Sequence, residues 1–171
     1  MRIIISSAIV SALLTTMSSG AAQQTPASLF NHLAGTWVLR GTIQNQKTIH
    51  DVDAAPVLNG GYMRLHEVSR EKDAHGGPAY EAIVFISQDQ KTGQFACLWL
   101  DTTSNAGLAP GSTMGRGTAA ANQIDFLFKN SADIFHTTFV YNPGADSWEW
   151  LMDDEKDGKL QPFARVTLTR K

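Results

Sequence analysis

The chain has 171 residues, of which 43% are hydrophobic and 18% are charged, and its formal charge at pH 7 is −2. This length allows one domain, and the composition supplies a hydrophobic core, which excludes a disordered chain. Basic residues form no run and are not interleaved with the aromatic residues, so we expect neither nucleic acid nor an anionic membrane surface as a partner.

Residues 1–22 are typical of a cleavable signal peptide. Arg2 supplies the positive charge, and the apolar stretch 3–14 is too short to span a bilayer. Small residues follow at 18–22, where signal peptidase needs them. A short membrane anchor is the alternative. We therefore predict a periplasmic or secreted protein that has no membrane contact after cleavage.

The rest of the chain is predicted to hold a linker and short helix over 23–34 and one β-barrel domain over 35–171. Within 26–33, Leu29 and Leu33 have the spacing of one helix face. Beyond this segment the sequence consists of short runs with period two, each ended by Gly, Pro, Asn or Asp, which is typical of strands joined by turns. Ten strands are predicted, at 37–43, 47–52, 62–70, 80–87, 94–101, 113–118, 123–129, 134–141, 147–152 and 163–170.

Short hairpin links make consecutive strands antiparallel, and closing a sheet removes its exposed edges. The sequence therefore predicts an all-β fold: an antiparallel up-and-down closed β-barrel of about eight to ten strands. The acidic segment 153–158 is expected to be a loop between the last two strands. The long segment 102–112 is expected to form the mouth or lid of the barrel.

Four stretches of the sequence resemble a bacterial family called domain of unknown function 1579, within the calycin superfamily of lipocalin-like barrels. They are 33–37, which holds Gly35-Thr36-Trp37, and 58–63, 80–101 and 166–171. The resemblance implies an interior pocket with no assigned chemistry. It also implies that Trp37 packs at the closed end against an arginine of the last strand, with Arg170 as the matching residue and Arg165 as second choice. Such a pair is a structural cation–π contact.

Candidate ligand contacts lie on the predicted strands. The segment 62–70 has two faces, one with Arg64 and His66 and the other with Met63 and Leu65, and the alternation fits either face inside. If Arg64 and His66 enter the lumen, an acidic partner or an anionic ligand must accompany them. Glu81 and Asp101 are the candidate acidic residues, and Trp99, Phe128 and Trp150 are the candidate aromatic contacts.

The prediction that follows is a barrel that binds a small, mostly apolar molecule in its lumen, with a carboxylate as one option for its polar group. One alternative is a small barrel enzyme, an isomerase, cyclase or hydrolase, that uses His66 and Glu81 as acid–base groups. Another is a structural protein whose lumen is filled by side chains. The sequence leaves the ligand's identity and the oligomeric state open.

Other chemistry has little support in the sequence. Cys97 is the single cysteine and lies in an apolar run, so we expect a small buried hydrophobe rather than a reactive thiol. No two of the five histidines have the close spacing of metal ligands, and we predict neither a metal site nor a resident cofactor. Haem held by His136 is an alternative if that side chain faces the lumen.

Overall fold

The computed structural model describes residues 26–103, 107–108, 111–131 and 133–171. The predicted signal peptide lies outside the described residues. The chain forms one short helix, α1 (Pro26–Asn31), and ten strands, which are β1 (Gly35–Ile43), β2 (Gln46–Val57), β3 (Tyr62–Ser69), β4 (Glu81–Gln88), β5 (Phe95–Asp101), β6 (Met114–Ala120), β7 (Gln123–Lys129), β8 (Ile134–Asn142), β9 (Ser147–Lys156) and β10 (Lys159–Arg170). No helix in these ranges is long or apolar enough to cross a membrane.

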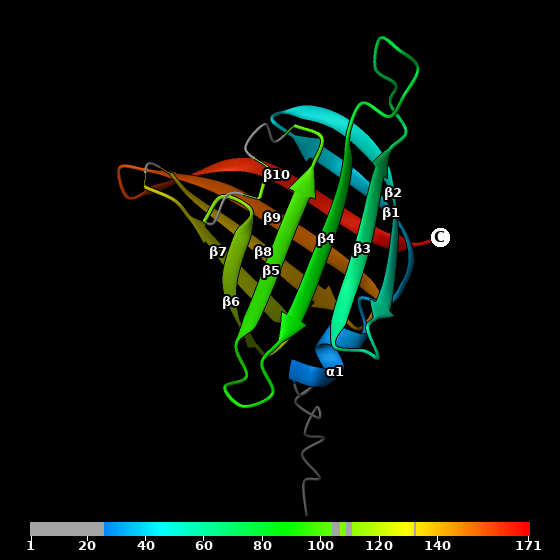
Figure 1. The fold of residues 1–171 in the computed structure, drawn as a ribbon. Helices are drawn as coiled ribbons and strands as arrows, with labels where there is room; N and C mark the ends of the chain where they lie inside the picture. Colours follow the sequence, from blue (N-terminus) through cyan, green and yellow to red (C-terminus); the bar gives the residue numbers. More distant parts are fainter. Residues whose placement is uncertain (1–25, 104–106, 109–110, 132) are drawn as a thin grey trace, which may run out of the picture.

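The ten strands form a closed up-and-down barrel (Figure 1). Each strand pairs antiparallel with its neighbours in sequence, and β1 closes the sheet by pairing with β10 from Trp37–Arg170 to Ile43–Ala164. The predicted fold class is therefore confirmed. Closure satisfies the edge hydrogen bonds that an open sheet of short hairpins would expose.

The main difference from the predicted elements is at the last hairpin. The segment 153–158 was expected to be a loop, but β9 continues to Lys156 and pairs with β10 from Lys159 onward. Asp157 and Gly158 alone make the turn, both with positive φ, at 53° and 71°. This two-residue geometry matches the twist of antiparallel strands and lets the ladder run to its end, whatever the charge of the strand residues.

Side chains alternate between the inside and the outside of the barrel. At the end of the barrel nearest to helix α1, the inner side chains form a dense aromatic core. Trp148, Trp150 and Phe139 are each 0% exposed there. The centroid of the Phe139 ring lies 4.7 Å from that of the Trp150 ring and 5.7 Å from that of the Phe126 ring, and both contacts are edge-on. This core fills one end of the barrel and leaves the other end for a site.

Helix α1 covers the filled end of the barrel, below the strands in Figure 1. Leu29 and Leu33 are 0% exposed, as expected from their spacing, and Leu33 accepts a 2.8 Å hydrogen bond from the indole nitrogen of Trp37. The Arg170 guanidinium lies 3.7 Å from the centroid of the Trp37 ring. The implied closed-end pair is thus present with Arg170.

The surroundings of Gly35 and Arg165 show why Arg170, and not Arg165, contacts Trp37. A Cβ at Gly35 would lie 2.0 Å from Arg170 Nη1, and φ at this position is 136°, so glycine leaves room for the guanidinium. Arg165, the second choice, lies on the outer face of β10, where it bonds Asp153 Oδ1 at 2.5 Å. It therefore has no part in the closed end.

Candidate functional site: a two-sided cavity at the open end of the barrel

A cavity of about 660 Å³ occupies the end of the barrel opposite α1. Its outer rim includes the exposed residues Gln44, Gln46 and Lys47, where β1 turns into β2. Side chains therefore fill the lumen at one end only, whereas the alternative of a structural protein has the lumen filled. A volume of this order is typical of small-molecule sites.

The cavity has two chemically different walls. The wall formed by β7 to β10 is mostly apolar, with Phe128, Phe135, Met152, Phe163 and Val166 facing the space. The wall formed by β2 to β5 and the connection between β3 and β4 is mostly polar, and its lining includes His50, Glu67, Ser69, Glu71, Tyr80 and Asp101. Such a cavity suits a molecule with an apolar body and a polar group on one side.

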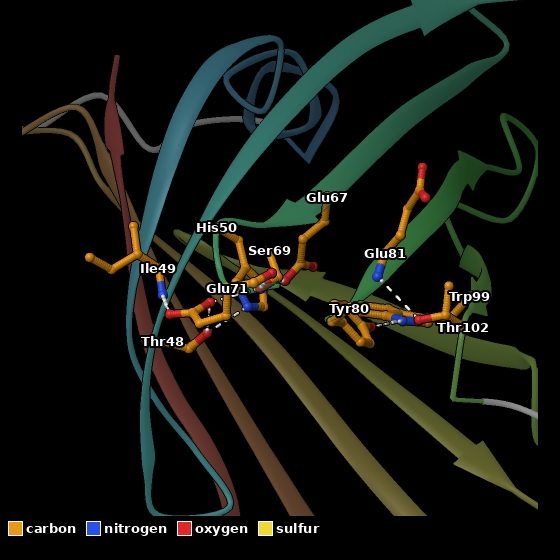
Figure 2. A network of polar contacts seen from close by, with 10 residues as sticks. All are labelled: Thr48, Ile49, His50, Glu67, Ser69, Glu71, Tyr80, Glu81, Trp99 and Thr102. Atoms are coloured by element: carbon orange, nitrogen blue, oxygen red, sulfur yellow. Dashed lines mark hydrogen bonds and ion pairs between the residues drawn. The ribbon is translucent and has the colours of Figure 1, made fainter. Parts of the chain in front are cut away.

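A buried histidine–glutamate pair anchors the polar wall (Figure 2). His50 Nδ1 bonds Glu67 Oε1, and each side chain is only 3% exposed. The other ring nitrogen, Nε2, lies 2.6 Å from Thr48 Oγ1, which lies 3.2 Å from Glu71 Oε2. Ser69 donates to the same Glu71 oxygen at 2.7 Å. The network connects β2 to β3 and to the residues just after β3.

One arrangement of protons satisfies all of these contacts. Glu71 only accepts, so the Thr48 hydroxyl donates to it and must itself accept from His50 Nε2–H. The other ring nitrogen, His50 Nδ1, makes its hydrogen bond to Glu67. The hydrogen bond from Ser69 lowers the pKa of Glu71, which keeps that carboxylate ionised.

Tyr80 and Trp99 extend the polar wall toward β5. The Tyr80 ring stacks on His50 with a centroid distance of 5.6 Å, and its hydroxyl accepts a 3.1 Å hydrogen bond from Trp99 Nε1. Burial raises the pKa of Tyr80 well above its ordinary value, with a further contribution from the negative charge at Glu67. The Tyr80 hydroxyl therefore stays protonated and remains a donor in the cavity.

This raised pKa gives a measurable pH dependence. In the unfolded chain the Tyr80 phenol ionises at about pH 10. In the folded barrel it keeps its proton at that pH. The stabilising contribution is complete below that pH and is lost as the pH rises from there through the higher pKa of the folded phenol. We expect the phenolate absorbance of Tyr80 to appear only when the barrel unfolds in alkali. In a spectrophotometric pH titration, Tyr80→Phe should remove absorbance that appears together with unfolding. If it instead removes absorbance that appears while the circular dichroism is still native, the prediction is wrong.

Of the predicted ligand contacts, three line the cavity. Trp99 and Asp101 face it from β5, and Phe128 faces it from β7. Trp150 lies beneath them in the aromatic core, 6.3 Å from Trp99, and is 0% exposed. Its indole nitrogen has no hydrogen-bond partner among the described residues.

The other three predicted contacts, Arg64, His66 and Glu81, lie on the outer face of the barrel. The interpretation that placed them in the lumen is therefore corrected. Arg64 bonds Asp53 at 2.5 Å and His66 bonds Glu81 at 2.6 Å, all as partly exposed pairs. The face of β3 with Met63 and Leu65 is the inner one, because these apolar side chains gain more from burial than charged ones. Figure 2 shows the Glu81 carboxylate directed away from Tyr80 and Trp99.

Apart from Asp101 and Trp99, sequence reasoning missed the residues that form the polar wall. His50 and Glu67 were not selected, and each lies on a strand face that mixes apolar and polar residues. His50 shares its strand face with Val52 and Ala54, and Glu67 shares its face with Met63 and Leu65. Counting apolar residues does not decide which face of β3 is inside, because Tyr62 and Val68 on one face balance Met63 and Leu65 on the other. Tyr80 carried no signal for its place in the cavity either, since it precedes β4.

The remaining candidates lie away from the cavity. His136, the residue of the haem alternative, lies on the outer face of β8 and bonds Glu155 at 2.8 Å. Cys97 is buried, as expected, and burial raises the pKa of its thiol. The enzyme alternative named His66 and Glu81, which are on the outside. The histidine in the lumen, His50, was not among the residues of that alternative; its two ring nitrogens contact Thr48 and Glu67.

The segment expected to form a mouth or lid, 102–112, is described only in part, since 104–106 and 109–110 lie outside the described residues. Thr103 and Ser112, at its two ends, line the cavity. They are consistent with the mouth of the barrel being at this end.

Comparison with known proteins adds no family. No protein-family model matches the chain, and a search of curated proteins finds no match. The class is therefore defined by structure alone: a closed ten-strand antiparallel up-and-down barrel with a buried aromatic core, consistent with a calycin-like fold.

Proposed function

We propose that this barrel binds a small, mostly apolar molecule in its lumen. The observation that carries the proposal is the cavity of about 660 Å³, walled by aromatic side chains on one side and by a hydrogen-bonded polar network on the other. Burial of the apolar body supplies the affinity, at roughly 25 cal/mol per Å² before the costs of binding. The polar wall fixes the orientation of the molecule.

The proposal includes the export and family assignment of the chain. We propose that residues 1–22 direct it to the periplasm or the exterior and are then removed, and that it is a lipocalin-like member of the domain of unknown function 1579 family. The pattern Gly35-x-Trp37 with Arg170 across the closed end supports the second part. Support for the first part is the sequence of residues 1–22 alone.

Native mass spectrometry of the full-length chain, expressed in a bacterial host and recovered from the periplasm and medium, examines both parts. We expect a protein mass that lacks the first 22 residues, and a second species that loses a small molecule on collisional activation. An intact leader would contradict the export proposal without touching the binding proposal.

Binding in the lumen is tested with N-phenyl-naphthylamine, an apolar dye that is uncharged at neutral pH. We expect a saturable one-to-one rise in its fluorescence. Thr137→Trp places an indole inside the cavity and should abolish binding, whereas Thr138→Trp places the same indole on the outer face of the same strand and should not. Unchanged binding to a folded Thr137→Trp variant would rule out the lumen as the site.

A further inference from the structure

We infer that the molecule bound in the lumen carries two separate polar groups, and that the group remote from the polar wall is an uncharged oxygen that hydrogen-bonds with Thr137. This inference rests on the proposed function and specifies the chemical class of the ligand. That class is a mostly apolar skeleton with a hydroxyl or carbonyl oxygen at its far end. An alkyl chain with a single polar head group does not belong to it.

The observation that carries the inference is the hydroxyl group of Thr137 on β8. Thr137 lines the cavity and is 1% exposed, yet its hydroxyl has no hydrogen-bond partner among the described residues. A buried hydroxyl without a partner costs free energy, and most such groups in folded proteins are paired. The cavity wall thus presents an unmet hydrogen-bonding group beside the space that a ligand would fill.

The side chains next to Thr137 cannot supply the partner. Across the sheet its neighbours are Phe126 on β7 and Met152 on β9. On the same face of β8 they are Phe135 and Phe139. All four are apolar. A buried water molecule is a poor partner here as well, because it needs about three polar groups around it. These surroundings leave the ligand as the molecule that completes the hydrogen bond.

A ligand can reach this hydroxyl from the cavity. Phe135 and Met152 line the same cavity as Thr137, so the three side chains border one space. Met152 can make room for a ligand atom, because the unbranched side chain of methionine adapts its shape easily. Rotation about the first side-chain torsion also moves the Thr137 hydroxyl between staggered positions. The hydroxyl can therefore meet a ligand without any movement of the strand.

The wall around Thr137 favours an uncharged group. Apart from Thr137, the described residues that line the cavity from β7 to β10 are all apolar. They are Phe128, Phe135, Met152, Phe163 and Val166. A charged group placed against this wall would lose its hydration and gain no opposite charge. A hydroxyl or carbonyl oxygen loses less on leaving water, and one hydrogen bond from Thr137 offsets that loss.

The two polar groups of the ligand lie on opposite sides of the lumen. In the ring of ten strands, β8 is diametrically opposite β3, which belongs to the polar wall. That wall offers the Tyr80 hydroxyl, which accepts from Trp99 and keeps its own proton to donate. A ligand that spans the lumen thus meets a hydrogen-bonding group on each side. We expect its two polar groups to be held apart by the apolar skeleton.

Three naphthol derivatives test the inference by calorimetry. Ethylnaphthol, acetylnaphthol and hydroxynaphthoate each have a hydroxyl at one end of the ring system and differ in the group at the opposite end. That group is apolar in the first, an uncharged carbonyl in the second and a carboxylate in the third. Thr137→Val should weaken the binding of acetylnaphthol about fivefold, the usual contribution of one neutral hydrogen bond. It should change the binding of ethylnaphthol by less than about twofold, and hydroxynaphthoate should bind the unchanged protein most weakly.

The stability of the variants without ligand gives a second measurement. Thr137→Val removes an unpaired buried hydroxyl, so it should raise the unfolding temperature or leave it unchanged. The matched control is Thr138→Val, the same substitution on the outer face of β8, where the hydroxyl donates to Asp125 Oδ1 at 2.8 Å. This control should not raise the unfolding temperature. It should leave the affinities for all three derivatives within about twofold, because Thr138 faces away from the lumen.

The possible failures are distinguishable. If Thr137→Val weakens acetylnaphthol and ethylnaphthol equally, or weakens neither, the inference is wrong, while binding of the apolar dye still supports the lumen as the site. Tightest binding of hydroxynaphthoate to the unchanged protein also overturns it. A lower unfolding temperature for Thr137→Val without ligand would show that the hydroxyl is already paired, which overturns it too. If neither the dye nor any derivative binds, the proposed function itself is wrong.

Discussion

Replacing His50 by leucine is expected to lower the free energy of unfolding by about 3–5 kcal/mol, because it leaves the buried Glu67 carboxyl without its partner. Both side chains are 3% exposed, so the Glu67 carboxyl stays largely buried when the imidazole is removed. Glu67→Leu alone should cost less, since the imidazole keeps its contact with Thr48. Urea unfolding followed by circular dichroism measures both effects.

The double variant, with leucine at both positions, is expected to be nearly as stable as the unchanged protein. Leucines of similar volume remove the desolvation cost of two polar groups together with their mutual attraction, and such replacements are often neutral or stabilising. The resulting double-mutant cycle reports the coupling of the pair. A double variant as unstable as His50→Leu alone would show that the pair is needed for folding.

A stable double variant would have a consequence for function. It would mean that the barrel folds without the buried pair, so the position of His50 and Glu67 in the cavity wall reflects what the cavity binds. These two residues support Thr48 and Tyr80, which in turn contact Glu71 and Trp99 in the cavity wall.

Trp37→Ala is expected to lower the free energy of unfolding by about 3–5 kcal/mol, as for other large aromatic side chains removed from a core. Trp37 is 0% exposed, donates to Leu33 and lies under the Arg170 guanidinium. Its removal opens a cavity between helix α1 and the barrel floor and leaves Arg170 without the indole face. Urea unfolding measures the change.

Thr36→Ala is the matched control for this prediction. Thr36 precedes Trp37 on the same strand but faces solvent, and its truncation should change the stability by less than about 0.5 kcal/mol. A loss below about 1 kcal/mol for Trp37→Ala would mean that the closed end repacks without the indole.

The sequence by itself predicted the architecture. Period two with frequent turn residues was enough to locate all ten strands, and hairpin-length links were enough to order them in an up-and-down barrel. These features are local, since each strand and turn is specified by a few consecutive residues. The contact at the closed end could also be predicted, from Gly35, Trp37 and Arg170, because these residues match the pattern that the resemblance to calycins implies.

Only the tertiary structure decided what the cavity contains. Arg64 and His66 alternate with Met63 and Leu65, and the choice between the two faces of β3 depends on what the neighbouring strands bring to the same side. A shift of one residue exchanges the inside and the outside of a strand. The partnership of His50 with Glu67 joins residues on two strands, and the unpaired hydroxyl of Thr137 is recognisable only once the whole ring of strands is closed. Pairing across strands is a property of the folded barrel, which no local pattern in the chain encodes.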